Sequence, residues 1–280
     1  MTVQIIRDVA EIRARVKELK KNGKTVCLVP TMGGLHAGHL SLIKKAKEIS
    51  DYVVVSIFIN PKQFNNPDDL ETYPSNETQD LNSIETQGAD IAFIPSAVEM
   101  YPKEFATDVK VTAGMDILCD AHRPGHFGGV STIVTKLFLQ VGADFACFGE
   151  KDYQQLFIIK RLVADLNIPI EIIPAPTVRE ADGLAMSSRN QRLSKSDREL
   201  APQLQQAMQS LKTKTQSGVS IDQACKETWE ALEAENNFKV EYLEVRCGEK
   251  MVLMDKLGDS CRLFAAAWLG GVRLIDNIKL

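Results

Sequence analysis

The first part of the chain alternates between an amphipathic segment and short apolar runs. Asp8 and Glu11 have the spacing of a capping box, and apolar residues recur at helical spacing over residues 9–19. Residues 26–29 and 52–59 are nearly continuous apolar runs, and the second is rich in β-branched residues. Such runs are typical of strands buried on both faces, as in a parallel sheet. The pattern therefore predicts a helix and then the first strands of such a sheet.

The same rhythm continues to about residue 176. The expected helices cover residues 39–49, 78–86, 130–140 and 153–166, and the expected strands cover residues 91–94, 145–148 and 168–173. Strands that alternate with helices in this way form βαβ units. We therefore predict a Rossmann-like, doubly wound parallel sheet of the α/β class over residues 1–176.

The pattern changes after the two prolines at positions 174 and 176. The expected elements are helices over residues 194–212 and 221–235 and strands over residues 240–245, 261–269 and 272–275. Helices followed by strands, rather than alternating with them, indicate an α+β unit. We predict a smaller C-terminal α+β domain, a lid, over residues 177–280.

Composition and charge narrow the function classes. The 280 residues are 44% hydrophobic and 25% charged, as in an ordinary folded protein, and 33 basic against 37 acidic residues give a net charge of −4. No block of five like charges occurs. A nucleic-acid-binding surface and a polybasic membrane anchor are therefore disfavoured, although a local cluster of cations can still bind a small anion.

The cysteines and the N-terminus favour a cytoplasmic location. No two cysteines form a C-x-x-C pair, the N-terminal residues are charged, and the apolar runs are too short to span a membrane. We expect reduced core thiols rather than a disulfide framework. The cysteines are Cys27, Cys119, Cys147, Cys225, Cys247 and Cys261.

The sharpest motif is a turn rich in glycine and histidine that leaves the strand at residues 26–29 and opens a helix. Glycines let the backbone approach a ligand closely, and free N–H groups at a helix start favour an anion such as phosphate. Two histidines three residues apart can both face that anion. A metal site would need a third ligand, which the local sequence does not provide. The turn consists of Met32, Gly33, Gly34, Leu35, His36, Ala37, Gly38 and His39.

This turn resembles the H-x-G-H signature of the nucleotidyltransferase superfamily, and the longer string resembles the pantothenate synthetase (pantoate–β-alanine ligase) family. Three further strings match that family in order, so the resemblance covers nearly the whole chain. Ile59 stands where the family often has valine. The strings are residues 58–64 (FINPKQF), 148–156 (FGEKDYQQL) and 179–190 (READGLAMSSRN).

The resemblance implies ATP-dependent condensation of (R)-pantoate with β-alanine through a pantoyl adenylate, with release of AMP and pyrophosphate. Mg²⁺ would accompany ATP. His39 would be the catalytic proton donor, and His36, Lys151 and Arg189 would join it in neutralising phosphate charge. ATP would be bound by Met32, Gly33, Gly34, Leu35, His36, Ala37, Gly38, His39, Gly149, Glu150, Lys151, Asp152, Val178, Met186, Ser187, Ser188 and Arg189.

The resemblance also implies residues for the two other substrates. Gln63 would bind pantoate and then β-alanine, Gln155 would bind pantoate, and Asn60 precedes Gln63 at the end of its strand. An amide suits this task because it both donates and accepts hydrogen bonds. Apolar residues on one helix face could contact the pantoate methyl groups or simply pack in the core. They are Val130, Ile133 and Val134.

Some assignments stay open. Asp152 could bind the ribose or position magnesium, or it could only cap the helix after it. Asp80 is a possible metal contact, although Ser75 and Gln79 depart from the family pattern in this loop. Residues 194–196 (SKS) superficially resemble the superfamily's phosphate loop, but we interpret them as the start of a helix.

Two other functions compete with the ligase. A cytidylyl- or adenylyltransferase of the same superfamily would share the histidine turn but would not need the residues assigned to pantoate. A non-catalytic nucleotide-binding module would be expected to have lost the histidines or the Ser-Ser-Arg loop, and this chain retains both. The resemblance also suggests a homodimer, to which residues 52–59 could contribute.

Overall fold

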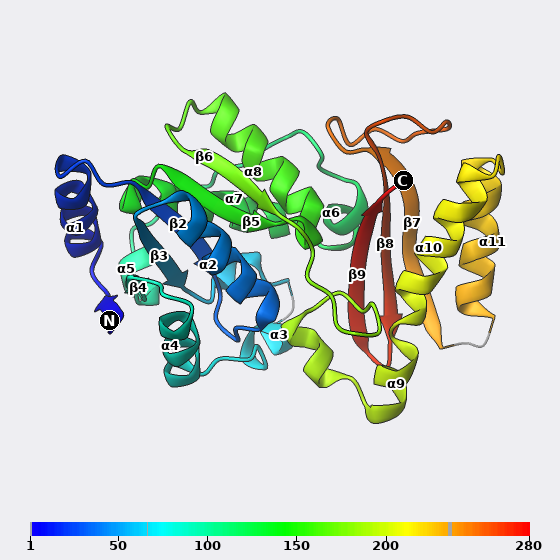
Figure 1. Cartoon of the computed structure of the whole chain (residues 1–280), viewed down its shortest axis with the longest axis horizontal. Helices are drawn as coiled ribbons and strands as arrows, with labels where there is room; N and C mark the ends of the chain where they lie inside the picture. Colours follow the sequence, from blue (N-terminus) through cyan, green and yellow to red (C-terminus); the bar gives the residue numbers. More distant parts are fainter. Residues whose placement is uncertain (1, 66, 235–236) are drawn as a thin grey trace.

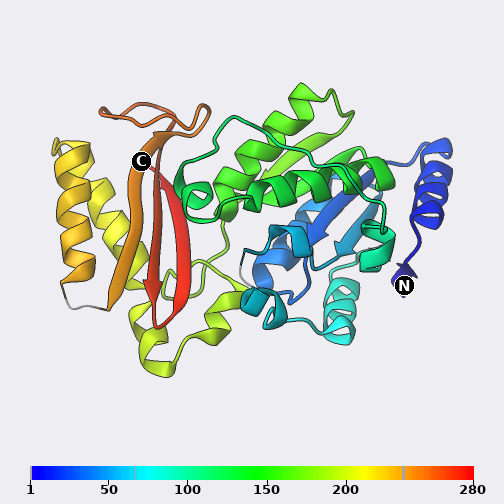
Figure 2. The ribbon, with the colours of Figure 1, turned by 180° about the vertical axis from the view of Figure 1, so that it is seen from behind.

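The computed structural model describes residues 2–65, 67–234 and 237–280, which fold into two lobes that lie side by side (Figure 1). The larger lobe contains a six-stranded parallel sheet with the order β1-β4-β3-β2-β5-β6. The smaller lobe contains an antiparallel sheet with the order β7-β8-β9. The N-terminus and α1 lie at the end of the larger lobe that is far from the smaller one (Figure 2). This architecture confirms the predicted fold class.

The elements have the following bounds. The strands are β1 (Gln4–Ile6), β2 (Val26–Thr31), β3 (Tyr52–Ile57), β4 (Ile91–Phe93), β5 (Phe145–Gly149), β6 (Glu171–Ala175), β7 (Phe238–Cys247), β8 (Cys261–Leu269) and β9 (Val272–Lys279). The α-helices are α1 (Val9–Lys21), α2 (Ala37–Ile49), α3 (Pro67–Glu71), α4 (Glu77–Thr86), α5 (Ala97–Met100), α6 (Leu118–His122), α7 (His126–Val141), α8 (Tyr153–Asp165), α9 (Lys195–Leu200), α10 (Gln203–Gln216) and α11 (Ile221–Glu233). Three short 3₁₀ helices are η1 (Pro61–Gln63), η2 (Glu150–Asp152) and η3 (Ser188–Arg192).

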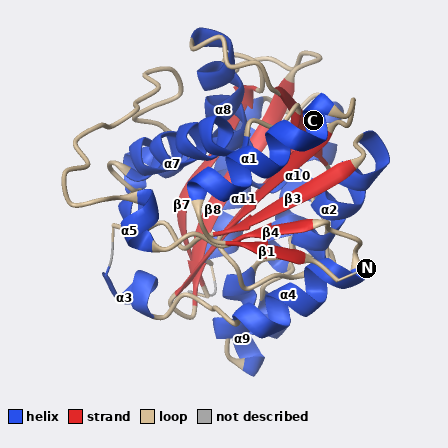
Figure 3. Ribbon diagram, turned by 90° about the vertical axis from the view of Figure 1, so that its left-hand side faces the viewer, coloured by secondary structure: helices blue, strands red, loops and turns tan. Residues whose placement is uncertain are grey.

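Helices cover both faces of the large sheet (Figure 3). Val26 and Leu28 of β2 belong to the apolar core with α1, α7 and α8, whereas Cys27 and Val29 belong to the core with α2 and α4. Successive strand residues point to opposite faces, so a strand covered on both sides must be apolar throughout. This confirms the interpretation of the apolar runs as buried parallel strands.

The chain order places a topological switch point beside β2. From β2 the chain builds outward through β3 and β4, and it then returns to add β5 on the other side of β2. In open α/β sheets, ligands bind at the carboxyl ends of the strands at such a point. The histidine turn follows β2 directly, and η2 follows β5, so both motifs meet at this edge.

Several expected boundaries were wrong for identifiable reasons. The helix predicted over residues 194–212 is two helices, α9 and α10, because Pro202 lies between them and cannot continue α9. Helix α7 begins at His126, four residues earlier than expected, because Gly128 and Gly129 are helical here rather than part of a turn. Strand β1 was not predicted at all.

The smaller lobe has its own apolar core between its sheet and the helices α10 and α11. Its opposite face packs against the larger lobe around Leu118, Tyr242 and Phe264. The segment after β6, which ends at Ala175, connects the lobes. The domain boundary at residues 176 and 177 stays a prediction.

Two other expectations change. Strand β3 lies between β2 and β4, and all its residues after Tyr52 are buried, so Tyr52 and Ile59 are the less buried residues of the segment suggested for a dimer surface, and that surface stays a prediction. Cys119 and Cys225 are only half-buried, so not every cysteine is a core thiol.

None of the described helices is long and apolar enough to cross a membrane, and the cytoplasmic location stays a prediction.

Candidate active site

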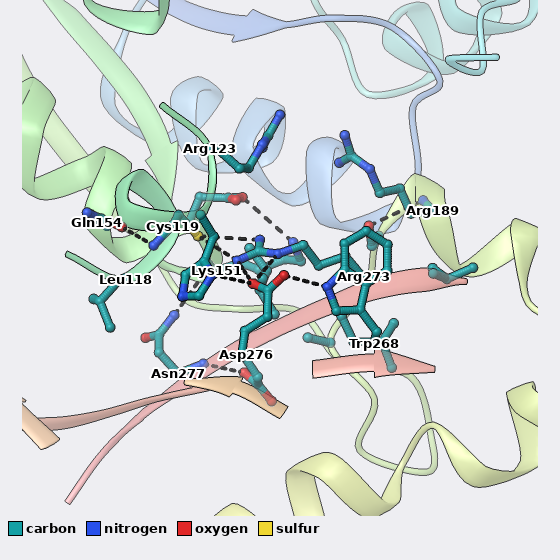
Figure 4. Close-up of a pocket in the computed structure, with 18 of the residues that line it drawn as sticks. Leu118, Cys119, Arg123, Lys151, Gln154, Arg189, Trp268, Arg273, Asp276 and Asn277 are labelled. Carbon is teal, nitrogen blue, oxygen red and sulfur yellow. Dashed lines mark hydrogen bonds and ion pairs between the residues drawn. The ribbon is translucent and has the colours of Figure 1, made fainter. Parts of the chain in front are cut away.

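Two adjoining cavities lie at the switch point. The inner cavity, of about 230 Å³, is enclosed by the histidine turn, the ends of β2 and β5, and α7. The outer cavity, of about 460 Å³, lies between the two lobes (Figure 4). Seven residues line both cavities and so form the passage between them: Arg123, His126, Lys151, Asp152, Gln155, Ser187 and Arg189.

The two histidines of the turn form a reciprocal capping box at the start of α2. The Nδ1 atom of His36 accepts a hydrogen bond from Gly38 N at 3.1 Å, and that of His39 accepts one from His36 N at 3.4 Å. Because both Nδ1 atoms accept, each neutral imidazole carries its proton on Nε2. The capping box thus fixes both rings with a remaining N–H donor, and the ring centroids lie 4.1 Å apart.

Both histidines are neutral at pH 7, which corrects the expectation that they act as cations. Burial lowers the pKa of His39 to about 3, and the neighbouring His36 and Lys151 lower it further. Burial together with Lys151 lowers the pKa of His36 to about 4. The imidazoles therefore offer phosphate neutral N–H donors, while Lys151 and Arg189 provide the positive charge.

The Asp80 side chain binds the backbone of the histidine turn. Its side-chain oxygens accept hydrogen bonds from Gly34 N at 3.0 Å and Leu35 N at 2.8 Å, and the residue is only 3% exposed. Gly34 has φ of +63°, and a Cβ there would lie 2.7 Å from the carbonyl oxygen of Pro74. These contacts favour a role for Asp80 in shaping the turn. Its metal contact stays a prediction.

The side-chain amides of Asn60 and Gln63 form a hydrogen-bonded pair in the lining of the inner cavity. Asn60 is 1% exposed; its Nδ2 donates to Gln63 Oε1 at 3.0 Å and to Gly129 O at 3.1 Å, and its Oδ1 accepts from the Tyr101 hydroxyl at 2.8 Å. Gln63 Nε2 in turn contacts Met32 Sδ at 3.0 Å. The geometry thus makes Asn60 the residue that orients Gln63, because its own polar atoms are already satisfied.

The apolar wall of the inner cavity comes from α7. Val130, Ile133 and Val134 line this cavity and also belong to the core of the larger lobe. Both uses considered for these residues are therefore compatible. Gln155 lines the cavity from α8, so amide groups and an apolar wall face the same space.

The turn that carries Lys151 is held by the smaller lobe. Nδ2 of Asn277 donates to the backbone carbonyls of Glu150 at 2.9 Å and Lys151 at 2.8 Å. Asp152 makes no side-chain cap for α8, and its carboxylate lies 3.8 Å from Lys151 Nζ. Partial enclosure opposes ionisation of Asp152, but Lys151 and Arg189 outweigh it and hold its pKa below the ordinary value. The backbone that carries Lys151 is therefore tied to β9 of the smaller lobe.

The Ser-Ser-Arg loop lines the same inner cavity as the histidine turn. Ser187 accepts a hydrogen bond from Arg189 N at 3.3 Å, and Met186 N donates to Val178 O at 3.0 Å. The guanidinium of Arg189 forms an ion pair with Asp69 of α3 at 2.9 Å, and Arg192 binds the other oxygen of Asp69 at 2.9 Å. Arg189 is thus already occupied by a carboxylate.

Most of the residues predicted for the site line one of the two cavities, and a few line neither. Those that line the inner cavity are Met32, His36, Gly38, His39, Asn60, Gln63, Gly149, Lys151, Asp152, Gln155, Val178, Met186, Ser187, Ser188 and Arg189. Those outside both linings are Gly33, Gly34, Leu35, Ala37, Asp80 and Glu150. Four further residues line a cavity and were not predicted from the sequence: Asp69, Tyr73, Arg123 and His126. An Arg-Pro-Gly-His string before α7 was the available signal for the last two.

The buried histidines predict acid lability. Burial, with a contribution from Arg123, lowers the pKa of His126 to about 4. His36, His39 and His126 gain protons near pH 6.5 when the chain unfolds, but only near pH 3 to 4 when it is folded. Stability is therefore lost as the pH falls below about 6.5, by roughly 3–5 kcal/mol between pH 7 and pH 5. Urea unfolding at both pH values measures this loss. His122→Asn, at an exposed histidine, should leave it unchanged, and equal stabilities at both pH values would contradict the buried neutral state.

Comparison with known proteins identifies the family of this chain. A family model described as pantoate-beta-alanine ligase matches residues 4–279. The pantothenate synthetase of Cereibacter sphaeroides strain ATCC 17029 is 52% identical over 276 residues, which cover 99% of both chains. That of Ruegeria sp. strain TM1040 is 48% identical over 288 residues and the full length of both.

Solved structures are similar over the same length. Pantothenate synthetase from Thermus thermophilus has a TM-score of 0.93 and 40% identity, with 99% of both chains covered. Pantoate-beta-alanine ligase from Francisella tularensis, complexed with beta-gamma ATP and beta-alanine, has a TM-score of 0.82 and 36% identity. The match covers 99% of this chain and 97% of that one.

Proposed function

The chain belongs to the pantoate-beta-alanine ligase family, and we propose that it joins pantoate to β-alanine in an ATP-dependent reaction. The observation that carries this proposal is the inner cavity, where amide groups and an apolar wall face a phosphate-binding histidine turn. A cytidylyl- or adenylyltransferase needs only the histidine turn. The buried Asn60–Gln63 pair beside the apolar face of α7 favours the ligase.

The proposed chemistry proceeds in two steps. A carboxylate is a poor acyl donor, so a pantoate carboxylate oxygen first attacks the α-phosphorus of ATP, and the bond to pyrophosphate breaks. The amine of β-alanine then attacks the acyl carbon of pantoyl adenylate, loses a proton and displaces AMP. No protein nucleophile is needed, and the rate comes from positioning and electrostatic stabilisation.

We assign the roles as follows. The Nε2–H groups of His36 and His39 donate hydrogen bonds to the phosphates. Because a neutral imidazole that lost this proton would become an imidazolate, we assign His39 as a hydrogen-bond donor rather than as the proton donor that the resemblance implies. Lys151 and Arg189 stabilise the negative charge that develops on the leaving pyrophosphate. Gln63 and Gln155 orient the pantoate carboxylate and hydroxyl groups, because an amide can donate and accept at once.

Mg²⁺ is proposed to arrive as the complex with ATP. The described residues contain no group of three or more His, Cys, Asp or Glu side chains that could hold a metal ion. Magnesium commonly keeps several waters and binds substrate phosphates with one or two carboxylates. Asp152, which lines both cavities beside Lys151, is the carboxylate that fits this role.

We also propose that the protein is a homodimer. Analytical ultracentrifugation at several protein concentrations tests this proposal.

Isotope exchange tests the proposed function. The enzyme should exchange labelled pyrophosphate into ATP only when pantoate is present, and β-alanine should then cause release of AMP. Exchange without pantoate would contradict the ligase. No exchange with any combination of these substrates would contradict it as well.

The Asp69–Arg189 ion pair predicts that removing the Asp69 charge lowers the KM for ATP. The triphosphate must compete with the Asp69 carboxylate for Arg189, so Asp69→Asn should lower the KM for ATP about two- to fivefold. Initial-rate kinetics with varied ATP measures this effect. Glu71→Gln, which removes an exposed carboxylate from the same helix, is the control. A higher KM for ATP in the Asp69 variant would show that this residue positions the loop instead.

A further inference from the structure

Arg123 is a half-buried cation without a carboxylate partner among the residues that the structure describes. It lines both the inner and the outer cavity. The other arginines nearby are paired: Arg189 with Asp69 at 2.9 Å and Arg273 with Glu241 at 2.7 Å. In Figure 4, dashed lines connect Arg273 to its neighbours and none reaches Arg123.

The protein anchors Arg123 but does not neutralise it. One guanidinium nitrogen makes a long hydrogen bond of 3.4 Å to Gln63 O, and the same carbonyl accepts from His126 Nδ1 at 2.7 Å. Burial lowers the pKa of Arg123, and the charges of Arg189 and Arg273 lower it further, whereas Cys119 and the Asp69 carboxylate, which forms no ion pair with Arg123, act against them. A partly desolvated guanidinium with most of its donors unused favours an anionic ligand.

We infer that Arg123 binds the carboxylate of β-alanine and thereby makes the second half-reaction specific for an amino acid over a simple amine. This inference rests on the proposed function and adds a residue to it. Arg123 contacts the backbone of Gln63, the residue assigned to pantoate and β-alanine, so its charge is fixed beside the reacting acyl group.

The dimensions of the substrate fit this position. In extended β-alanine the nitrogen and the carboxyl carbon lie about 4 Å apart, which is the span of three single bonds. A carboxylate held by Arg123 in the passage between the cavities therefore leaves the amine free to reach into the inner cavity. The outer cavity opens this route from the cleft between the lobes.

A phosphate group is the competing anion, and the surroundings favour the carboxylate. The triphosphate already has Lys151, Arg189 and the two Nε2–H donors of the histidine turn. Pyrophosphate leaves with its charge before aminolysis, whereas the amine substrate still needs a cation at that stage. Arg123, held on the Gln63 side of the passage, supplies one.

The test separates the two half-reactions in Arg123→Gln and Arg123→Lys. In Arg123→Gln, loss of a charge-assisted pair should lower kcat/KM for β-alanine about 10- to 100-fold, mainly through KM, with a change of less than about threefold in the KM for ATP during exchange. Arg123→Lys should recover part of the loss. Arg161→Gln, on the exposed face of α8, is the matched control.

An amine without a carboxylate gives the decisive comparison. The wild-type enzyme should prefer β-alanine to n-propylamine, and this preference should fall in Arg123→Gln by the same factor as kcat/KM for β-alanine. An unchanged preference would overturn the inference, as would a loss of exchange equal to the loss of aminolysis, which would assign Arg123 to the phosphates. Near-ultraviolet circular dichroism of each variant checks the fold. Wild-type protein that lacks exchange would instead contradict the proposed function.

Discussion

Replacing His39 by alanine is expected to lower turnover about 1,000-fold, because the change removes a hydrogen-bond donor that stabilises the charge developing on the phosphates. The Nδ1 atom of His39 is engaged by the backbone of His36, so its Nε2–H is the atom left for the substrate. Steady-state release of AMP measures this loss. The fold should remain, because His39 lines the inner cavity and does not belong to the apolar cores of the larger lobe.

Two conservative variants distinguish the hydrogen bond that His39 accepts at Nδ1 from the one that it donates at Nε2. In His39→Asn the shorter amide can accept from His36 N in place of Nδ1, which restores the capping box without a donor at the Nε2 position. In His39→Gln the amide can extend a donor toward that position. We expect His39→Gln to be more active than His39→Asn. The reverse order would show that His39 acts through the shape of the turn, and near-normal turnover in His39→Ala would remove it from the reaction.

The second large effect is expected at Gly129, where α7 passes close to η1. A Cβ on Gly129 would lie 2.3 Å from the Lys62 carbonyl oxygen, 2.5 Å from its carbon and 2.8 Å from Gln63 N. All three are backbone atoms, so they cannot move aside without displacing Gln63. Gly129→Ala should therefore cost about 3 kcal/mol of stability and raise the KM for pantoate strongly.

The neighbouring glycine provides a matched control. A Cβ on Gly128 would meet nothing within 4 Å. Since alanine is a better helix former than glycine, Gly128→Ala should be neutral or stabilising by up to about 1 kcal/mol. Urea unfolding and pantoate kinetics of both variants measure the contrast. Equal effects of the two substitutions would contradict the close approach of α7 to η1.

The sequence could predict those parts of the fold that local pattern controls. The apolar run of β2 must be buried on both faces, and the glycine and histidine spacing after it is legible because glycine and capping are local properties. Strand β1 is too short to show a period, and its pairing with β4 joins residues far apart in the chain. Pro202 shows that one residue can divide an otherwise convincing amphipathic pattern.

In the candidate site, too, local motifs could be predicted from the sequence, whereas contacts between distant segments could not. The strings that contain His36, His39, Lys151 and Gln63 were visible, but their partners lie on distant segments. Asp80 supports the turn from 46 residues away, and its role follows only from its contacts with two backbone N–H groups. The neutral state of the histidines also depends on burial, which spacing alone does not reveal.

Arg123 illustrates the limit most clearly. Its sequence neighbourhood resembles an ordinary helix start, and an arginine there is most often solvated. Its significance comes from the lack of an ion pair to any carboxylate among the described residues, and from its place between two cavities. Such properties belong to the assembled fold.

Transfer of an oxygen isotope tests the central claim most directly. Pantoate labelled with ¹⁸O in its carboxylate is converted in the presence of ATP and β-alanine, and the products are analysed by mass spectrometry. If the carboxylate attacks the α-phosphorus, one labelled oxygen must appear in AMP, with none in pyrophosphate. Unlabelled AMP, or label in pyrophosphate or inorganic phosphate, would contradict an adenylate formed at this site.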